Sequence, residues 1–299
     1  MHERYYAAST YYHSVFGRPI QKAVLDIGCT CPNIDGTISA GGCLFCDGGS
    51  GHFTRPGTVA QQLEAEQQRI QKTYPDAGMI AYFQAHTNTY GDPFFLRKCY
   101  LEALQHPNVV GISIGTRPDC LSEAILLVLE EIAAKTNLTV ELGLQTIHDK
   151  TARLFHRGYD FPVFVQAVEK LRRRGIRVCV HLINGLPGEI DADMLESARV
   201  LGTLRPDGVK IHLLHILRGT PLENLWRSGA VEVLSMAEYV QITAAQLSLL
   251  PPDTVIERLT GDGASDRLLA PLWSTEKRVA KNAIAQHLKR TDSWQGKYF

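Results

Sequence analysis

Between residues 24 and 217, short apolar segments alternate with longer amphipathic ones. The short segments are rich in β-branched residues or nearly continuous in apolar character, as buried parallel strands are. They cover residues 24–28, 79–84, 109–115, 139–145, 177–183 and 209–216. The segments between them have helical periodicity and cover residues 59–73, 94–105, 121–135, 161–175 and 191–204. This alternation predicts a parallel α/β fold, either a doubly wound sheet or an open barrel of six strands.

The pattern changes after Gly219, where the regular alternation of strands and helices stops. We therefore expect an N-terminal segment over residues 1–20, an α/β catalytic unit over residues 21–219 and a helical C-terminal extension over residues 220–299. Within the extension, the ERLTGDG segment at residues 257–263 predicts a turn.

Charge and hydrophobicity exclude several classes of protein. Lys plus Arg and Asp plus Glu each total 31, so the net charge is zero. This balance argues against a protein that coats nucleic acid non-specifically, although a local basic patch remains possible. The sequence has no apolar run of about 18 residues, and its first residues lack the apolar centre of a secretory signal. We expect a cytoplasmic protein that does not enter a membrane.

Cys31, Cys43 and Cys46 form a close group, with eleven and two residues between successive members. Gly and Pro are frequent in this segment, which predicts a loop. In a reducing compartment such a group indicates a metal site or catalysis more often than disulfides. Three thiolates can bind three irons of a [4Fe–4S] cubane and leave the fourth iron open. A zinc site is the alternative, with Cys29 or His52 as a further ligand.

Several longer segments occur in a recognisable order along the chain. They are LDIGCTCPNIDGTISAGGCLFCDGGSG, IAYFQAHTNTY, GISIGTRPDC, VELGLQTIHDKTARLFHRGYD, HLINGLPGE and VKIHLLHILRGTPLE. Together they resemble the YhcC/YtqA-like radical S-adenosylmethionine (SAM) family, a relative of the Elongator catalytic-subunit group. The resemblance extends from about residue 11 to residue 296. It implies a partial TIM-type (β/α)6 open barrel with a C-terminal helical extension.

The resemblance also implies a chemistry. Cys31, Cys43 and Cys46 would bind a [4Fe–4S] cluster, and Cys29 would not, because the family usually has another residue there. SAM would chelate the open iron, and one electron from a reductant such as flavodoxin or ferredoxin would cleave it to a 5′-deoxyadenosyl radical. Kinship with the Elongator group implies tRNA modification at the wobble uridine. A protein side chain or a small metabolite is the alternative substrate, and a non-catalytic zinc or RNA-binding module is the third hypothesis.

Six residues near the predicted strand ends are candidates for binding SAM. Phe45 offers a ring beside an adenine, and Arg157 offers a guanidinium for the SAM carboxylate. A surface salt bridge is the alternative role for Arg157. Gly185 would let the backbone approach the cofactor closely, although its segment is also compatible with an ordinary strand-to-helix turn. The other candidates are Asn88, Gln145 and Ile183.

The last predicted strand supplies candidates for the substrate site. Lys210 and His212 share one face of a regular strand and are the candidate catalytic residues, whereas His215 would lie on the other face. A buried histidine with a purely structural role is the alternative. Arg258 and Asp262 are weaker candidates from the extension.

The basic segment at residues 277–290 lies near Trp273, Trp294 and Tyr298. It is either a solvated helix face or an RNA-docking surface.

Overall fold

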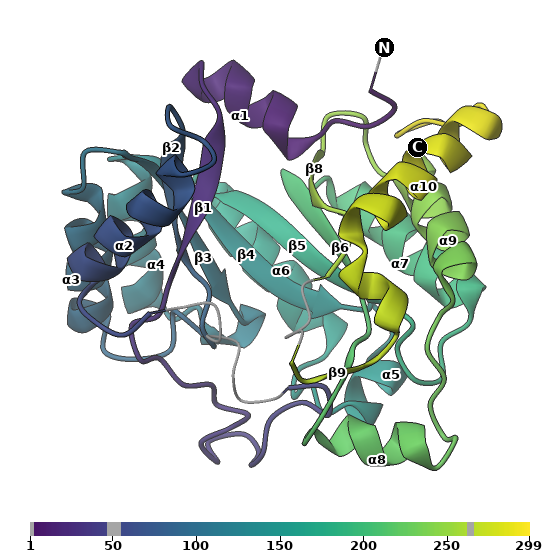
Figure 1. Cartoon of the computed structure of the whole chain (residues 1–299). Coiled ribbons are helices and arrows are strands. Elements are labelled where there is room, and N and C mark those ends of the chain that lie inside the picture. The colour runs from purple at the N-terminus through teal and green to yellow at the C-terminus, as the bar shows by residue number, and fades with distance from the viewer. Residues whose placement is uncertain (1–2, 47–54, 262–265) are drawn as a thin grey trace.

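We describe a computed structural model of the chain, which covers residues 3–46, 55–261 and 266–299. Its centre is a sheet of seven parallel strands in the order β1-β2-β3-β4-β5-β6-β8. The sheet curls into a half-barrel, and helices surround it (Figure 1). The strands are β1 (Ile20–Leu25), β2 (Gly78–Phe83), β3 (Val109–Thr116), β4 (Asn137–Gln145), β5 (Arg177–Asn184), β6 (Gly208–Leu213) and β8 (Val255–Arg258). The predicted partial TIM-type barrel is therefore confirmed.

Helices connect successive strands and cover the outer face of the sheet. Their boundaries follow local chemistry. For example, the Ser122 hydroxyl accepts a hydrogen bond from the backbone N–H of Ile125 and so caps the start of α4. The connecting helices are α2 (Val59–Gln71), α3 (Pro93–Leu104), α4 (Glu123–Ala133), α5 (Asp149–Leu154), α6 (Phe161–Arg173) and α7 (Asp191–Leu204).

The two faces of the sheet differ in polarity because successive side chains of a strand point in opposite directions. The outer face is apolar and packs against the helices, as Leu25, Ile114 and Val180 do. Residues of the inner face include Tyr82, Glu141 and Lys210, which line a cavity inside the half-barrel. The fold thus has an apolar core outside the sheet and a polar interior enclosed by it.

The C-terminal extension adds a strand that the sequence analysis did not predict. β8 pairs in parallel with β6 and ends at Arg258, inside the segment for which we expected only a turn. Four residues are too short to show a clear period, which is why the pattern missed this strand. The helices of the extension are α8 (Pro221–Arg227), α9 (Met236–Leu249) and α10 (Lys277–Arg290).

The first strand also differs from its prediction. β1 begins at Ile20 and ends at Leu25, several residues earlier than the expected 24–28. The polar residues Gln21 and Lys22 interrupt the apolar pattern, so the sequence concealed this start. At the same end of the half-barrel, α1 (Ala8–Phe16) lies next to the two edge strands. The Tyr12 hydroxyl donates to Glu257 (3.0 Å), and Lys22 forms an ion pair with Glu257 (3.2 Å), so these contacts link β1 to β8.

A small second sheet lies beyond the main one. It consists of β7 (Ile216–Leu217) and β9 (Leu268–Ala270), which pair in antiparallel fashion. A separate apolar cluster that includes Phe155, Leu186 and Leu222 lies in this region, and Phe45 packs against it. Among the described residues, no helix has the length and apolar character needed to span a membrane.

Candidate active site

The three clustered cysteines lie on the long loop that follows β1, as predicted. A backbone hydrogen bond from Cys46 N–H to the Cys43 carbonyl (2.8 Å) closes the turn between two of them. Asn33 connects this loop to the loop after β4 through hydrogen bonds. Its Nδ2 donates to the carbonyl oxygens of His156 (2.7 Å) and Arg157 (3.0 Å) and lies 3.6 Å from the Cys43 Sγ.

The donor set on this loop fits a [4Fe–4S] cluster with three cysteine ligands. Burial raises the pKa of Cys43 to about 11, and the neighbouring Cys46 and Cys31 thiols raise it too. These thiols therefore share one local environment. An amide donor beside a thiol, as Asn33 is beside Cys43, is the kind of contact that tunes the potential of a cluster.

Cys29 belongs to a different environment from the other cysteines of this segment. It packs against the outer apolar core, and burial, followed by Cys99, raises its pKa to about 12. This packing agrees with the expectation that Cys29 is not a metal ligand, which stays a prediction. His52, the other zinc ligand that we considered, lies outside the described residues, as does Asp262.

Arg157, the predicted donor for the SAM carboxylate, is buried in the loop after β4. Its side chain is 1% exposed, and its N–H groups donate to the carbonyl oxygens of Leu144, Thr146 and Tyr159 and to Asp149 (3.1 Å). These contacts hold the loop after β4. They agree with a structural ion pair, although a buried one and not the surface bridge that we had considered.

The other candidates for SAM binding lie at or beyond the carboxyl ends of the strands. Asn88 is fully buried, and its Nδ2 donates to the Phe83, Ala85 and Gly115 carbonyl oxygens, whereas its Oδ1 has no partner in the described structure. Gln145 ends β4 with a positive φ of 63° and accepts a hydrogen bond from the Tyr159 hydroxyl (3.4 Å).

Phe45, Ile183 and Gly185 contact mainly apolar side chains. The Phe45 ring lies 5.3 Å from that of Phe155. Ile183 packs against the same apolar cluster and pairs in register with His212 on the neighbouring strand. A Cβ at Gly185 would lie 3.2 Å from Leu234, and its φ of 83° favours glycine. The adenine contacts assigned to these three residues stay a prediction.

A buried ionic network lies inside the half-barrel, with Glu141 of β4 at its centre. The Glu141 carboxylate accepts hydrogen bonds from Lys22 (2.7 Å), from the Tyr82 hydroxyl (2.8 Å) and from Lys210, and it lies 2.8 Å from His181 Nε2. Burial alone would raise the pKa of Glu141, but Lys210 and Lys22 outweigh this effect and hold it well below its usual value. Glu141 is therefore charged at neutral pH.

Lys210 and His212 both line the cavity, so the predicted shared face of β6 is confirmed. Burial lowers the pKa of Lys210 to about 8, even though Glu141 raises it. Burial, followed by His181 and Arg258, holds the pKa of His212 well below its usual value, so this imidazole is neutral. Its Nε2 has no hydrogen-bond partner in the described structure.

We expected His215 on the opposite face from His212 only if the strand stayed regular as far as His215, and this condition is not met. β6 ends at Leu213, so the regular alternation stops before His215. A Cβ at Gly261 would lie 2.7 Å from His215 Cε1 and 3.7 Å from His212 Nδ1, so both imidazoles approach this glycine. Arg258, the weaker candidate from the extension, lines the cavity together with His212.

The sequence analysis missed four residues of this network: Lys22, Tyr82, Glu141 and His181. A signal for two of them was present, since Glu141 and His181 are ionisable residues inside the predicted strands 139–145 and 177–183. Such residues are rarely buried without a partner. Because the partners lie on strands far apart in the sequence, the sequence pattern does not show which of these residues contact each other.

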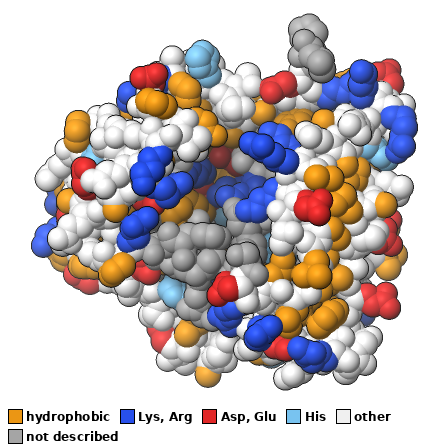
Figure 2. Space-filling model, in the orientation of Figure 1, with side chains coloured by type: hydrophobic (Ala, Val, Ile, Leu, Met, Phe, Trp, Pro, Cys, Tyr) orange, Lys and Arg blue, Asp and Glu red, His pale blue; other side chains and the backbone are white. Residues whose placement is uncertain are grey.

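The completed cavity has a volume of about 220 Å³, and residues of β2 to β6 and β8 surround it. Figure 2 shows this face of the molecule hollowed between β1 and α10, with Lys and Arg side chains around the hollow. Basic and neutral imidazole groups thus face a small space at the centre of the half-barrel.

Comparison with known proteins agrees with this geometry. Residues 34–201 match the family model of the Radical SAM superfamily, and residues 206–290 match the Radical_SAM C-terminal domain. The chain is 43% identical to the uncharacterized protein YtqA of Bacillus subtilis, over 99% of this chain and 93% of that protein. It is 36% identical to protein YhcC of Escherichia coli, over 91% of this chain and 88% of that protein.

The fold is similar to that of a solved archaeal protein, the Elp3 of Methanocaldococcus infernus, with a TM-score of 0.71 at 18% identity. That match covers 92% of this chain and 64% of the Elp3 chain. The family model covers more than half of the chain, and the loop after β1 carries the three cysteines that we predict to be the cluster ligands. The chain therefore belongs to the radical SAM superfamily, as an enzyme whose cofactors are a [4Fe–4S] cluster and SAM.

Proposed function

We propose that this enzyme modifies the wobble uridine of tRNA. The observation that supports this most directly is the small cavity of the half-barrel, in which Lys210, Arg258 and His212 face a space of about 220 Å³. That volume is below the roughly 300–1,000 Å³ of typical ligand pockets. A cavity of this size suits one group of a larger substrate. A single nucleobase could enter it while the rest of the RNA stays outside. The resemblance to the Elongator catalytic-subunit group points to the same class of substrate.

Cys31, Cys43 and Cys46 would hold the cluster on the loop that follows β1. When bound, the cluster supplies the electron that cleaves SAM and so generates a 5′-deoxyadenosyl radical. Radical SAM enzymes need a reductant, and we propose that a flavodoxin or ferredoxin of the cytoplasm supplies it.

The residues of the cavity would orient the substrate. The Lys210 ammonium is held by Glu141 and lies 3.2 Å from the Tyr82 hydroxyl, so its position is fixed before a substrate enters. An ammonium held in this way donates to a carbonyl or acidic oxygen of a base. The neutral His212 imidazole, whose Nε2 is unpartnered in the described structure, can accept or donate a second hydrogen bond. Both roles are positional and precede the radical step.

The test uses the enzyme with its cluster reconstituted under anaerobic conditions, SAM, a reductant and tRNA from a strain that lacks the gene. We expect 5′-deoxyadenosine to form faster when tRNA is added, and a wobble nucleoside to change mass. Cys43→Ala is the control. It should form no 5′-deoxyadenosine and should leave the mass of the wobble nucleoside unchanged. If tRNA changes neither readout while SAM is still cleaved, the tRNA proposal is wrong and a protein side chain or small metabolite becomes the substrate to seek.

A further inference from the structure

Helix α10 carries a row of lysines on the face that is exposed to solvent. Residues 277–290 include five Lys or Arg and no Asp or Glu, although the whole chain has no net charge. Lys277, Lys281 and Lys289 are separated by four and eight residues, so they lie on one side of the helix. The opposite side carries the buried apolar residues Ala280, Ile284 and Leu288.

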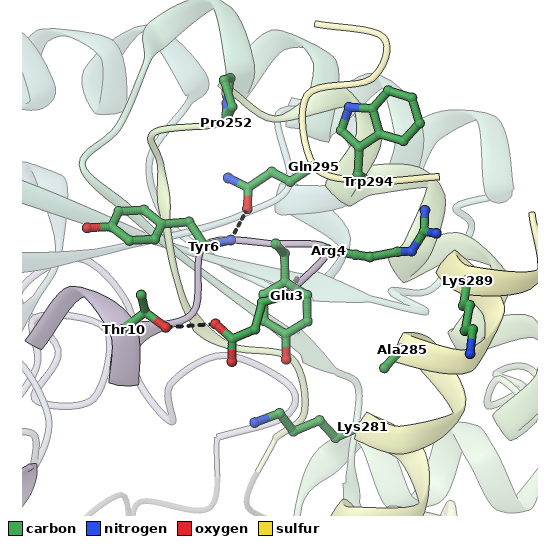
Figure 3. A pocket seen from close by; sticks show the side chains of 11 residues that line it. Glu3, Arg4, Tyr6, Thr10, Pro252, Lys281, Ala285, Lys289, Trp294 and Gln295 are labelled. Atoms are coloured by element: carbon green, nitrogen blue, oxygen red, sulfur yellow. Dashed lines mark hydrogen bonds between the residues drawn. The ribbon is translucent and has the colours of Figure 1, made fainter. Parts of the chain in front are cut away.

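One end of this row borders a large cavity of about 1040 Å³ between the N-terminal segment, α10 and the C-terminal residues (Figure 3). Lys281 and Lys289 line it together with the rings of Tyr5, Tyr6 and Trp294. Within the described part of the chain, neither lysine makes an ion pair or a hydrogen bond. Trp294 is 44% exposed, and the Lys297 ammonium lies 5.0 Å from the centroid of its ring.

The same cavity contains two charged groups that already have partners. Glu3 accepts a hydrogen bond from the Thr10 hydroxyl (2.7 Å), as Figure 3 shows. Arg4 forms an ion pair with Asp292 (3.0 Å). Lys281 and Lys289 are therefore the cationic groups of this lining that have no carboxylate partner among the described residues.

The other end of the row, at Lys277, lies near Arg258 and His215. Burial and then the Arg258 guanidinium lower the pKa of Lys277, and Lys277 in turn contributes to the low pKa of His215. Arg258 lines the reaction cavity. At 1.5 Å of rise per residue, Lys277 and Lys289 lie about 18 Å apart along the helix. With one phosphate per roughly 3.4 Å of a strand, this length corresponds to about five phosphates.

We propose that Lys277, Lys281 and Lys289, together with Trp294, form a lysine track that binds the backbone of the RNA substrate and leads the target base to the reaction cavity. This inference rests on the proposed function. Lys281 and Lys289, which have no carboxylate partner among the described residues, attract the phosphates, and the aromatic rings of the large cavity offer surfaces on which unpaired bases stack. Because the chain has no net charge, the attraction is local to the track.

The test measures binding of bulk bacterial tRNA to the reconstituted enzyme by fluorescence anisotropy at several salt concentrations. The double variant Lys281→Ala/Lys289→Ala should bind about tenfold more weakly than the wild type at low salt. The slope of log affinity against log salt should also fall by about 2, because each lost phosphate contact removes about one unit. Iron content and the thermal unfolding midpoint establish that the variant is folded.

The matched control is Lys72→Ala/Lys98→Ala, which removes two exposed lysines from the region of α2 and α3. It should bind tRNA with the affinity and salt slope of the wild type. Trp294→Ala tests the stacking contact separately, and should weaken binding of a single-stranded oligoribonucleotide about tenfold without changing the slope.

The outcomes separate this inference from the proposed function. If the wild type binds tRNA with a steep salt slope and Lys281→Ala/Lys289→Ala does the same, the lysine track is wrong and the RNA docks elsewhere. If the control variant loses as much affinity as the track variant, the binding is non-specific and the track is again wrong. If the wild type binds no tRNA, both the proposed function and the track are overturned.

Discussion

Replacing Glu141 with glutamine keeps the shape of the side chain and removes the negative charge at the centre of the half-barrel. Glu141 is fully buried and faces the ammonium groups of Lys22 and Lys210. In the variant Lys22 keeps its second partner, Glu257 at 3.2 Å, whereas Lys210 loses the carboxylate to which it is paired. Removing one partner of a buried ion pair typically costs about 3–5 kcal/mol. We expect Glu141→Gln to lie at the lower end of this range.

The pKa of Lys210 sets an upper limit on the share of this stability loss that comes from Lys210. Lowering this pKa from 10.5 to about 8 already costs the wild type about 3 kcal/mol. Without Glu141 the pKa falls further, but at pH 7 the penalty is limited to about 5 kcal/mol, because the amine then deprotonates. Lys210 therefore adds at most about 1–2 kcal/mol to the loss of stability.

The hydrogen bonds to Glu141 account for the rest of the loss. Tyr82 and His181 each exchange a bond to a charged carboxylate for one to a neutral amide, at about 1 kcal/mol each. The free energy of unfolding should thus fall by about 3 kcal/mol at pH 7. For a chain of this size, the midpoint of thermal unfolding should fall by about 6 °C.

The stability difference between the wild type and Glu141→Gln should depend on pH, and the direction of this change can be checked. Above about pH 8, Lys210 is neutral in the folded state of both the wild type and Glu141→Gln, and it is still protonated in both unfolded states up to its ordinary value of 10.5. The contribution of Lys210 to the difference in stability therefore disappears, and the gap between the two proteins should narrow by about 1–2 kcal/mol from pH 7 to pH 9.

Chemical unfolding followed by circular dichroism under anaerobic conditions, at both pH values, measures the gap. Glu131→Gln is the control, because Glu131 pairs with Arg97 on the exposed surface and water screens the pair. Its stability should equal that of the wild type. A gap for Glu141→Gln below about 1 kcal/mol at pH 7, or one that widens at pH 9, would refute the argument that this carboxylate supports buried ammonium groups.

Three further predictions concern other parts of the site. Cys43→Ala should lose cluster iron and 5′-deoxyadenosine formation. Cys29→Ala should keep both, because the Cys29 thiol packs against the apolar core. Iron and sulfide analysis measures the cluster content of both variants. The rate with tRNA should fall as pH rises through about 8, because Lys210 then loses its charge, and a pH–rate profile of Lys210→Met should lack this fall. Arg157→Lys should lower the free energy of unfolding by about 3 kcal/mol, because a lysine cannot reach Asp149 and three carbonyl oxygens together; thermal unfolding measures the loss.

Each of these predictions has a clear contrary result. A Cys29→Ala protein without iron would place that thiol among the cluster ligands. A rate that stays constant from pH 7 to pH 9 would remove Lys210 from the substrate site. An Arg157→Lys protein with wild-type stability but weak SAM binding would favour the cofactor role that the sequence analysis first assigned to this arginine.

Much of the chemistry could be predicted from the sequence, because it depends on residues that are close together along the chain. The spacing of Cys31, Cys43 and Cys46 indicates a three-thiolate site without reference to any distant residue. The period of the apolar residues likewise predicts strands such as β4 and helices such as α6, since burial on one face imposes a repeat on local sequence.

The tertiary structure decided the contacts that join distant segments. It placed Glu141 beside Lys22, 119 residues earlier, and Lys210, 69 residues later. It also supplied β8 as a seventh strand and enclosed Arg157 among carbonyl oxygens. A local pattern reports only whether a side chain is polar or apolar, and which polar groups meet depends on strand order and register. For that reason the sequence determined the class of fold and predicted the metal ligands, whereas only the folded chain determined the interior of the half-barrel.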